Sequence, residues 1–194
     1  MLASVAEIVF RQSDSGFDEF VASGLDETFE AVKSRRTTNP QARLEGYAFQ
    51  KLFLDMLTDE RVGLVVGKDF RYEQFFDKQK CEALGHSPAC KMDFIFPNFI
   101  VDTKRSITAT SKINHQTSRY LDHTDHLIRV TLNQKYKTAL ENNKRLTDMT
   151  VYEFIERSED LLGVEIPNRW KSQFLDYARD AANRIEDAWE NSFP

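Results

Sequence analysis

The chain has 194 residues, which is the length of one domain or of one domain with a small appendage. It is 41% hydrophobic with 15 phenylalanines, enough for a substantial core, and its 7 glycines and 5 prolines exclude a low-complexity or collagen-like chain. The net charge of −5 argues against a protein that coats nucleic acid through bulk charge, but it is compatible with a local basic surface and with carboxylates that hold a metal.

The sequence predicts neither a membrane span nor a signal peptide. No apolar run approaches the roughly 20 residues that cross a bilayer, and no basic stretch precedes the short apolar run at the N-terminus. The two cysteines do not make a disulfide framework, so we expect a cytoplasmic protein with no membrane partner. The phosphate-binding pattern G-x-x-x-x-G-K-[ST] is absent from the sequence, and no nucleotide cofactor is expected.

The N-terminal part of the chain is expected to be helical. Apolar side chains recur at spacings of three and four within residues 1–34, and a polar, basic break follows at 33–38. Asn39 before Pro40 is typical of a helix start, and the apolar positions predict that this second helix runs to about residue 59.

The centre of the chain is expected to form strands. A run rich in valine and aromatic residues predicts a strand within 62–72, and residues 78–90 are polar and turn-prone. Two short β-rich runs, 92–96 and 99–103, flank Pro97-Asn98 and predict a hairpin. The periodicity of the remainder predicts one more strand and three helices, in the order helix 111–120, strand 126–132, helix 151–162 and helix 168–191.

The predicted hairpin carries the residues that indicate chemistry. Residues two apart on a strand share a face, so Asp102 and Lys104 project together. If the hairpin is symmetric about Pro97-Asn98, Asp93 faces Asp102, with Cβ atoms about 4.5–5.5 Å apart. Carboxylates at this distance repel one another unless a cation lies between them, and Mg²⁺ prefers carboxylate oxygens and water. The alternative is an exposed hairpin with a cross-strand ion pair between Asp93 and Lys104.

A third acid and the lysine fit the same site. Glu45 lies on the apolar stripe of its helix, and an acid in that position needs a partner, so we expect it beside the metal or among its ligands. It could instead only favour the helix dipole. Lys104 can orient an attacking water or balance charge in the transition state, while a metal lowers the pKa of water and polarises a phosphoryl oxygen. These parts suit hydrolysis of a phosphodiester.

Asp93, eight intervening residues and then Asp102-Thr103-Lys104 resemble the PD-(D/E)XK nuclease superfamily, which includes many type II restriction endonucleases. An upstream helical acid, here Glu45, belongs to the same pattern, whereas Met92 stands where the motif has proline. Over about residues 45–132 the resemblance implies a restriction-endonuclease-like core, in which the acids bind Mg²⁺, the lysine assists the water and the substrate is double-stranded DNA. The Gln116–Tyr120 segment is also similar to the QxxxY element of recombination-type members.

We therefore expect an α/β (α+β) fold with a central mixed four- to five-stranded sheet flanked by helices. The chain is expected to be a single domain, 1–194, with an N-terminal helical part (1–38), a catalytic core (39–135) and a C-terminal helical part (136–194). The expected hydrolase is a Mg²⁺-dependent type II site-specific restriction endonuclease, in which Mn²⁺ can replace Mg²⁺. A homodimer would let one site per chain cut both strands. The alternatives are a homing, repair or recombination nuclease and a catalytically inactive DNA-binding module.

Polar and basic residues outside the motif are candidate phosphate contacts, which would position DNA without reading its sequence. They are Arg35, Arg36, Arg43, Arg105, Lys112, Gln116, Lys135 and Lys137, with a further basic pair at Lys144-Arg145. The alternative for each cluster is a solvated surface.

Cys81, His86 and Cys90 raise the question of zinc, whose fourth ligand would be one of the later histidines, His115, His123 or His126. Structural zinc sites usually show two close pairs of ligands, but these cysteines are nine positions apart. The sequence therefore favours a loop with free thiols over a structural zinc site.

Overall fold

The computed structural model describes residues 46, 49–50, 52–54, 56–58, 70–75, 78–85, 91–104, 111–132, 143–171 and 183, and in 111–114 it describes the backbone only. The chain divides into two compact units, Leu57–Asn168 and Met1–Met56 with Arg169–Pro194. The predicted single domain and its internal boundaries stay predictions. The described residues between 46 and 58 are helical, in agreement with the predicted second helix, and the predicted helix over 1–34 lies outside the described residues.

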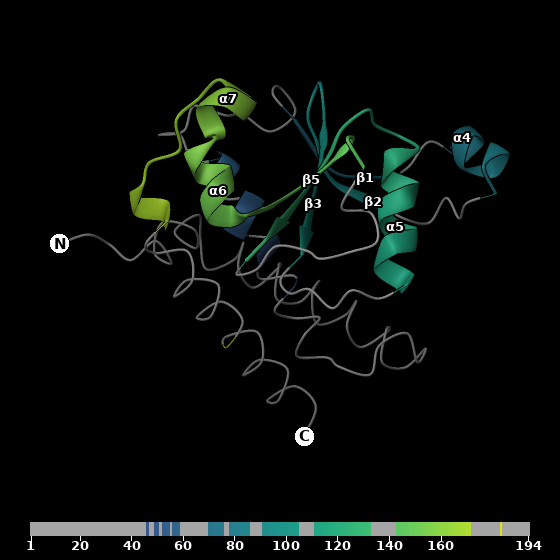
Figure 1. Ribbon diagram of the computed structural model, residues 1–194, viewed down its shortest axis with the longest axis horizontal. Coiled ribbons are helices and arrows are strands. Elements are labelled where there is room, and N and C mark those ends of the chain that lie inside the picture. The colour runs from purple at the N-terminus through teal and green to yellow at the C-terminus, as the bar shows by residue number, and fades with distance from the viewer. Residues whose placement is uncertain are drawn as a thin grey trace, which may run out of the picture. The chain divides into compact units, whose positions relative to one another are not determined.

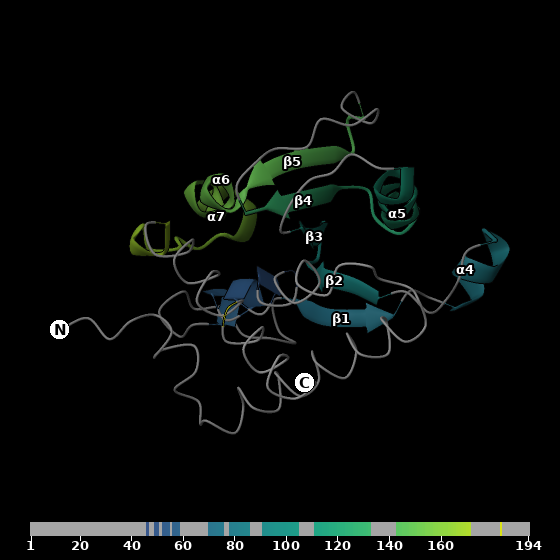
Figure 2. The ribbon, with the colours of Figure 1, turned by 90° about the horizontal axis from the view of Figure 1, so that it is seen from below.

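The unit Leu57–Asn168 contains a five-stranded mixed sheet in the order β1-β2-β3-β4-β5 (Figure 2). The strands are β1 (Arg71–Phe75), β2 (Lys91–Ile95), β3 (Ile100–Lys104), β4 (Leu127–Thr131) and β5 (Leu146–Thr150). The first three strands pair antiparallel, and β3, β4 and β5 pair parallel. With the helices α4 (Lys78–Ala83), α5 (Ser111–Leu121), α6 (Val151–Glu156) and α7 (Ser158–Leu162), the fold is α/β, as expected.

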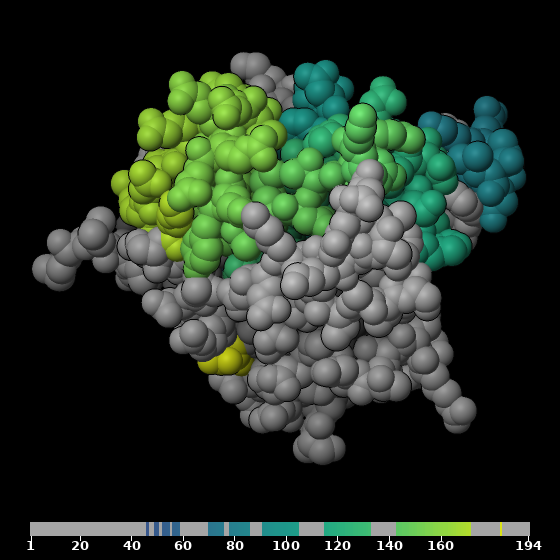
Figure 3. Space-filling model, in the orientation of Figure 1, coloured from purple at the N-terminus to yellow at the C-terminus, as the bar shows by residue number. Residues whose placement is uncertain are grey.

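The two central strands are the most deeply buried. Every residue of β4 is buried, and in β3 only Lys104 is not. Parallel strands in such a position need cover on both faces of the sheet. Helix α5 and the α6–α7 pair lie on opposite sides of the strands (Figure 1). On the surface in Figure 3 the same two helical segments, in teal and yellow-green, flank the residues of β5.

The β2–β3 hairpin has the predicted register. Phe94 pairs with Val101 and Ile95 with Ile100, and the Phe96 N–H donates to the Phe99 carbonyl at 2.9 Å across the turn. The Phe96 and Phe99 rings stack with their centroids 4.7 Å apart, so a side-chain contact stabilises the same turn as the main-chain hydrogen bond.

Two elements predicted within residues 62–90 differ from the structure. Strand β1 runs from Arg71 to Phe75, so it extends beyond the C-terminal end of the strand expected within 62–72. Residues 62–69 lie outside the described part of the chain. The expected turn region 78–90 was wrong at its start, because residues 78–83 form α4. Its Lys-Gln-Lys-Cys-Glu-Ala sequence is rich in good helix formers.

Strand β5 was not predicted, because its Leu-Thr-Asp-Met-Thr sequence shows no clean alternation of apolar and polar residues. The helix predicted over 151–162 is two short helices separated at Arg157. Among the described helices, none has the length and apolar composition needed to cross a membrane.

The β5–α6 junction is closed by a capping box. The Glu153 N–H donates to Thr150 Oγ1 at 3.2 Å, and the Thr150 N–H donates to Glu153 Oε2 at 2.8 Å. Two main-chain donors that the first turn would leave unpaired are thereby satisfied.

Replacing Thr150 by alanine should lower the free energy of unfolding by about 1 kcal/mol, because the Glu153 N–H loses its acceptor. Urea denaturation followed by circular dichroism measures this loss. Glu153→Gln is the matched control, since a glutamine oxygen can still accept from the Thr150 N–H, and it should lose clearly less. Equal stability of Thr150→Ala and the native chain would contradict the assignment.

Candidate functional site

Asp93 and Asp102 lie directly beyond the last pair of the β2–β3 ladder, Phe94 with Val101, where the two strands part. Asp93 is close enough to Asp102 for its charge to raise the pKa of Asp102. Beyond this point the Asp93 carboxylate replaces a main-chain acceptor: its Oδ2 accepts from the Thr103 N–H and from Thr103 Oγ1, both at 2.9 Å. The local geometry therefore places one acid between the two strands.

The second oxygen of Asp93 is contacted by Tyr120 of α5. The Tyr120 hydroxyl lies 3.4 Å from Asp93 Oδ1 and 3.2 Å from the Lys91 carbonyl oxygen. Burial and, to a smaller extent, the negative charges of Asp93 and Asp102 raise the pKa of Tyr120 well above its usual value, so this hydroxyl remains a donor at neutral pH. Tyr120 was not among the predicted site residues, although the segment that it ends was singled out.

Asp102 is almost completely buried, at 1% exposure. Lys104 Nζ donates to its Oδ1, whereas its Oδ2 is buried and has no hydrogen-bond partner within the described part of the chain. Burial raises the pKa of Asp102 to about 6, Lys104 opposes this shift, and the neighbouring Asp93 adds to it. The positive charge around Asp102 therefore does not offset the cost of burying its carboxylate.

A buried arginine continues the row of charges across the sheet. Arg129 of β4 is the register partner of Asp102 on one side and of Asp148 on the other. Its guanidinium donates to both Asp148 carboxylate oxygens, at 2.6 and 2.5 Å, and to Thr117 Oγ1 at 3.0 Å. Sequence reasoning missed this residue. The available signal was a charged side chain in the middle of an otherwise apolar strand.

The other predicted metal ligand, Glu45, lies outside the described residues. Within the described ranges, no three His, Cys, Asp or Glu side chains lie close enough to hold a metal ion together. The candidate metal centre in this part of the chain therefore consists of Asp93 and Asp102, with Lys104 beside them.

Two of the candidate DNA contacts lie on helix α5. Gln116 is half-buried on α5, and Lys112 lies in the same helix without a described side chain. The others lie outside the described residues: Arg35, Arg36, Arg43, Arg105, Lys135 and Lys137. Arg145 has a structural role, because its guanidinium donates to the Leu121 and Thr124 carbonyl oxygens.

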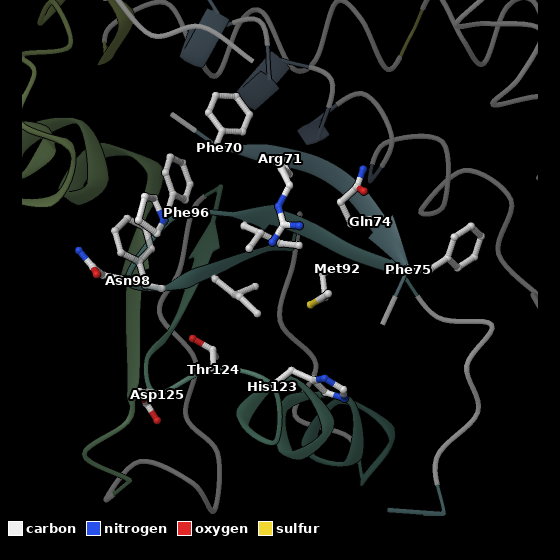
Figure 4. Close-up of a pocket in the computed structure, with 14 residues that line it drawn as sticks. Phe70, Arg71, Gln74, Phe75, Met92, Phe96, Asn98, His123, Thr124 and Asp125 are labelled. Carbon is white, nitrogen blue, oxygen red and sulfur yellow. The ribbon is translucent and has the colours of Figure 1, made fainter. Parts of the chain in front are cut away.

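A separate cavity of about 790 Å³ lies at the β2–β3 turn. Figure 4 shows lining residues on β1 and directly before it (Phe70, Arg71, Gln74, Phe75), on the β2–β3 turn (Phe96, Asn98) and on the α5–β4 turn (His123, Thr124, Asp125). Asp93, Asp102 and Lys104 do not line it, so the cavity and the acidic pair are distinct features.

The raised pKa of Asp102 predicts a pH-dependent stability. The folded chain binds the Asp102 proton more tightly than the unfolded chain does, with pKa values of about 6 and 3.8. The contribution to stability is therefore complete below about pH 4 and is lost as the pH rises through 6, at up to about 1.4 kcal/mol per pH unit. Asp102→Asn stays neutral, so it should become progressively more stable than the native chain across this interval.

Urea denaturation at a series of pH values in EDTA measures the difference between the two proteins. Asp122→Asn changes an exposed aspartate and should follow the native profile. Parallel profiles for the native chain and Asp102→Asn would show that burial does not perturb this carboxyl.

Comparison with known proteins assigns no family to this chain. No protein-family model matches the chain, and no curated protein and no solved structure matches it either. The site is therefore interpreted from its own residues.

Proposed function

We propose that this chain is a Mg²⁺-dependent endonuclease of double-stranded DNA, with a restriction-endonuclease-like core and the activity of a type II site-specific restriction endonuclease. The observation that carries the proposal is the neighbouring pair Asp93 and Asp102 at the end of the β2–β3 ladder, with Lys104 bound to Asp102. This is the D…DxK arrangement placed at the point where two strands separate.

The architecture supports the proposal. A mixed sheet flanked by helices is what the resemblance to PD-(D/E)XK nucleases implies, and this chain has antiparallel β1–β3 joined to parallel β3–β5. The acidic pair and the lysine come from β2 and β3, and β3 is the strand at which the antiparallel and parallel parts of the sheet meet.

The residues present fit a divalent cation. Asp102 Oδ2 is buried without a partner in the described region, and the raised pKa of this carboxyl indicates a deficit of positive charge. Mg²⁺ favours carboxylate oxygens, so Asp93 and Asp102 would hold it, with Glu45 as a third candidate and with Mn²⁺ as a replacement. When bound, the ion would supply a water of lowered pKa and a polarised phosphoryl oxygen.

The side chains of the site would divide the remaining tasks. Lys104, held against Asp102, would orient the attacking water and stabilise the negative charge that develops on the phosphate. Thr103 and Tyr120 fix the orientation of the Asp93 carboxylate, which would otherwise rotate freely. A homodimer would provide one such centre for each DNA strand.

Cleavage of plasmid DNA tests the proposal. With Mg²⁺ the native chain should cut, with EDTA it should not, and Asp93→Ala, Asp102→Ala and Lys104→Ala should each lose about 100-fold or more in rate, because each removes several kcal/mol of charge stabilisation. Asp122→Asn, on the exposed turn after α5, is the control and should retain the native rate.

The products separate the alternatives. Discrete bands support a site-specific enzyme, whereas a smear or stepwise trimming of ends would indicate a repair or recombination nuclease. If the chain binds the plasmid but leaves it intact under all conditions, the result would favour a catalytically inactive DNA-binding module.

A second prediction concerns the support of Asp93. Thr103→Val removes the hydroxyl that donates to Asp93 Oδ2 while it keeps the shape of the side chain and the main-chain N–H. Loss of such a supporting contact costs about 10- to 100-fold in metal affinity or activity, and Thr103→Ser should restore most of it. The Mg²⁺ concentration for half-maximal cleavage measures the effect, and identical values for all three proteins would exclude a supporting role for the hydroxyl.

A further inference from the structure

The cavity at the β2–β3 turn has the size of a ligand site. Its volume of about 790 Å³ lies within the range of roughly 300–1,000 Å³ that small-molecule sites occupy. All of its lining residues are described, and all belong to the unit Leu57–Asn168. Met92, Phe96 and Ile100 are buried in its wall, and the hydrogen bond across the turn fixes the hairpin from which they come. The packed sheet therefore preforms the cavity.

The rim of this cavity carries an aromatic ring that the fold leaves in solvent. Phe75 ends β1 and is 61% exposed, and the only other large apolar side chain so exposed among the described residues is Leu84, at 45%. Lys91, the register partner of Phe75, has its Nζ 5.4 Å from the centroid of the ring. An exposed ring beside an ammonium group offers a flat apolar surface at a positively charged place, which suits a flat ring in an anionic ligand.

An unusual main-chain conformation gives β1 this exposed end. Glu73 has a φ of 47°, in the left-handed region that a residue with a side chain rarely adopts. The alternation of the strand is interrupted there, and Gln74 and Phe75 are exposed one after the other. The Glu73 carboxylate binds Lys91 Nζ at 3.3 Å, across to β2. Strained residues of this kind persist where the surrounding structure holds them, and they cluster at functional sites.

Arg71 supplies a cation that no described residue neutralises. Neither its guanidinium nor the side chains of Asn98 and Asp125 has a hydrogen bond or an ion pair within the described part of the chain. Figure 4 shows the Arg71 side chain reaching from β1 into the space between the lining residues. A guanidinium binds phosphate through two parallel hydrogen bonds, and carboxylates and amides are groups that recognise the edges of nucleobases.

The histidine of the cavity is engaged elsewhere. His123 Nε2 lies 3.8 Å from Sγ of Cys81, a free cysteine that is fully buried. His86 and Cys90, the other residues of the zinc alternative, lie outside the described residues. The polar groups that the cavity offers to a ligand are therefore those of β1 and of the two turns.

We propose that this cavity binds an unpaired nucleotide, with its base against Phe75 and its phosphate on Arg71. A nucleotide combines the features that the lining complements: a flat ring, a polar ring edge and an anion. A base within a duplex is stacked on both faces and cannot reach the ring, so the nucleotide is either free or part of a single-stranded or extruded segment. The site extends the proposed function without depending on it, because the cavity shares no residue with the acidic pair.

Isothermal titration calorimetry of the full chain in EDTA, with a single-stranded oligodeoxynucleotide, tests the proposal. Phe75→Ala should weaken binding about 5- to 150-fold, the effect of losing one stacked base, and Phe75→Tyr should restore most of it because it keeps a ring. Arg71→Gln should reduce the slope of log affinity against log salt by about 0.7, the value for one phosphate contact on a single strand. Leu84→Ala changes the other exposed apolar side chain and should bind like the native chain.

The same titration with free deoxynucleoside monophosphates identifies the source of the nucleotide. Equal affinity for a monophosphate and for the strand would assign the cavity to free nucleotides, whereas clearly tighter binding of the strand would assign it to nucleic acid.

Three results would overturn the proposal. They are a native chain that binds neither ligand, unchanged affinity in both Phe75→Ala and Arg71→Gln, and a Phe75→Ala chain that loses only a dimer in analytical ultracentrifugation. EDTA suppresses metal-dependent cleavage, so nucleotide binding by a chain that never cuts DNA would uphold this site and contradict only the nuclease.

Discussion

The electrostatic cost of two opposed carboxylates inside a sheet is the constraint on which the rest of the described site depends. A buried carboxylate needs hydrogen bonds or positive charge, and like charges across a strand pair add to that need. Asp93 meets the requirement through Thr103 and Tyr120. Asp102 meets only part of it through Lys104, and its raised pKa reflects the remainder. This imbalance distinguishes the pair from an ordinary ion pair on a hairpin.

The surrounding sheet is organised around the same row of charges. Arg129 lies next to Asp102, but its guanidinium binds Asp148 on the following strand. The positive charge of Arg129 is therefore balanced by Asp148 and not by the acidic pair. Among the charges that lower the pKa of Asp102, the contribution of Arg129 is smaller than that of Lys104. The arginine therefore stabilises the sheet without compensating the buried carboxylate of Asp102.

The sequence predicted the hairpin and its register because both depend on local signals. Pro97-Asn98 sets the turn, and the apolar runs on either side fix which residues face each other. The structure confirms that register for Phe94 with Val101 and for Ile95 with Ile100. Helix α5 and strand β4 after the hairpin were also predicted, the strand because apolar residues flank Arg129 within it.

The missed features depend on contacts between distant segments. Strand β5 is recognisable only by its pairing with β4, and the partners of Arg129 and Cys81 come from other elements. Periodicity reports which face of an element is buried, but it does not report what covers that face. The resemblance of Gln116–Tyr120 to the QxxxY element drew attention to Tyr120, but its contact with Asp93 is visible only in the structure.

Helix α5 and the turn that follows it make three of the described contacts. Thr117 and Tyr120 of the helix contact Arg129 and Asp93, and His123 of the turn contacts Cys81. Thr117 and Tyr120 lie on one face of the helix, because residues three apart are neighbours on a helix surface. A slip of α5 by one residue would misalign all three contacts together. Substitutions that loosen the seating of this helix should therefore affect the acidic pair even when they lie far from it.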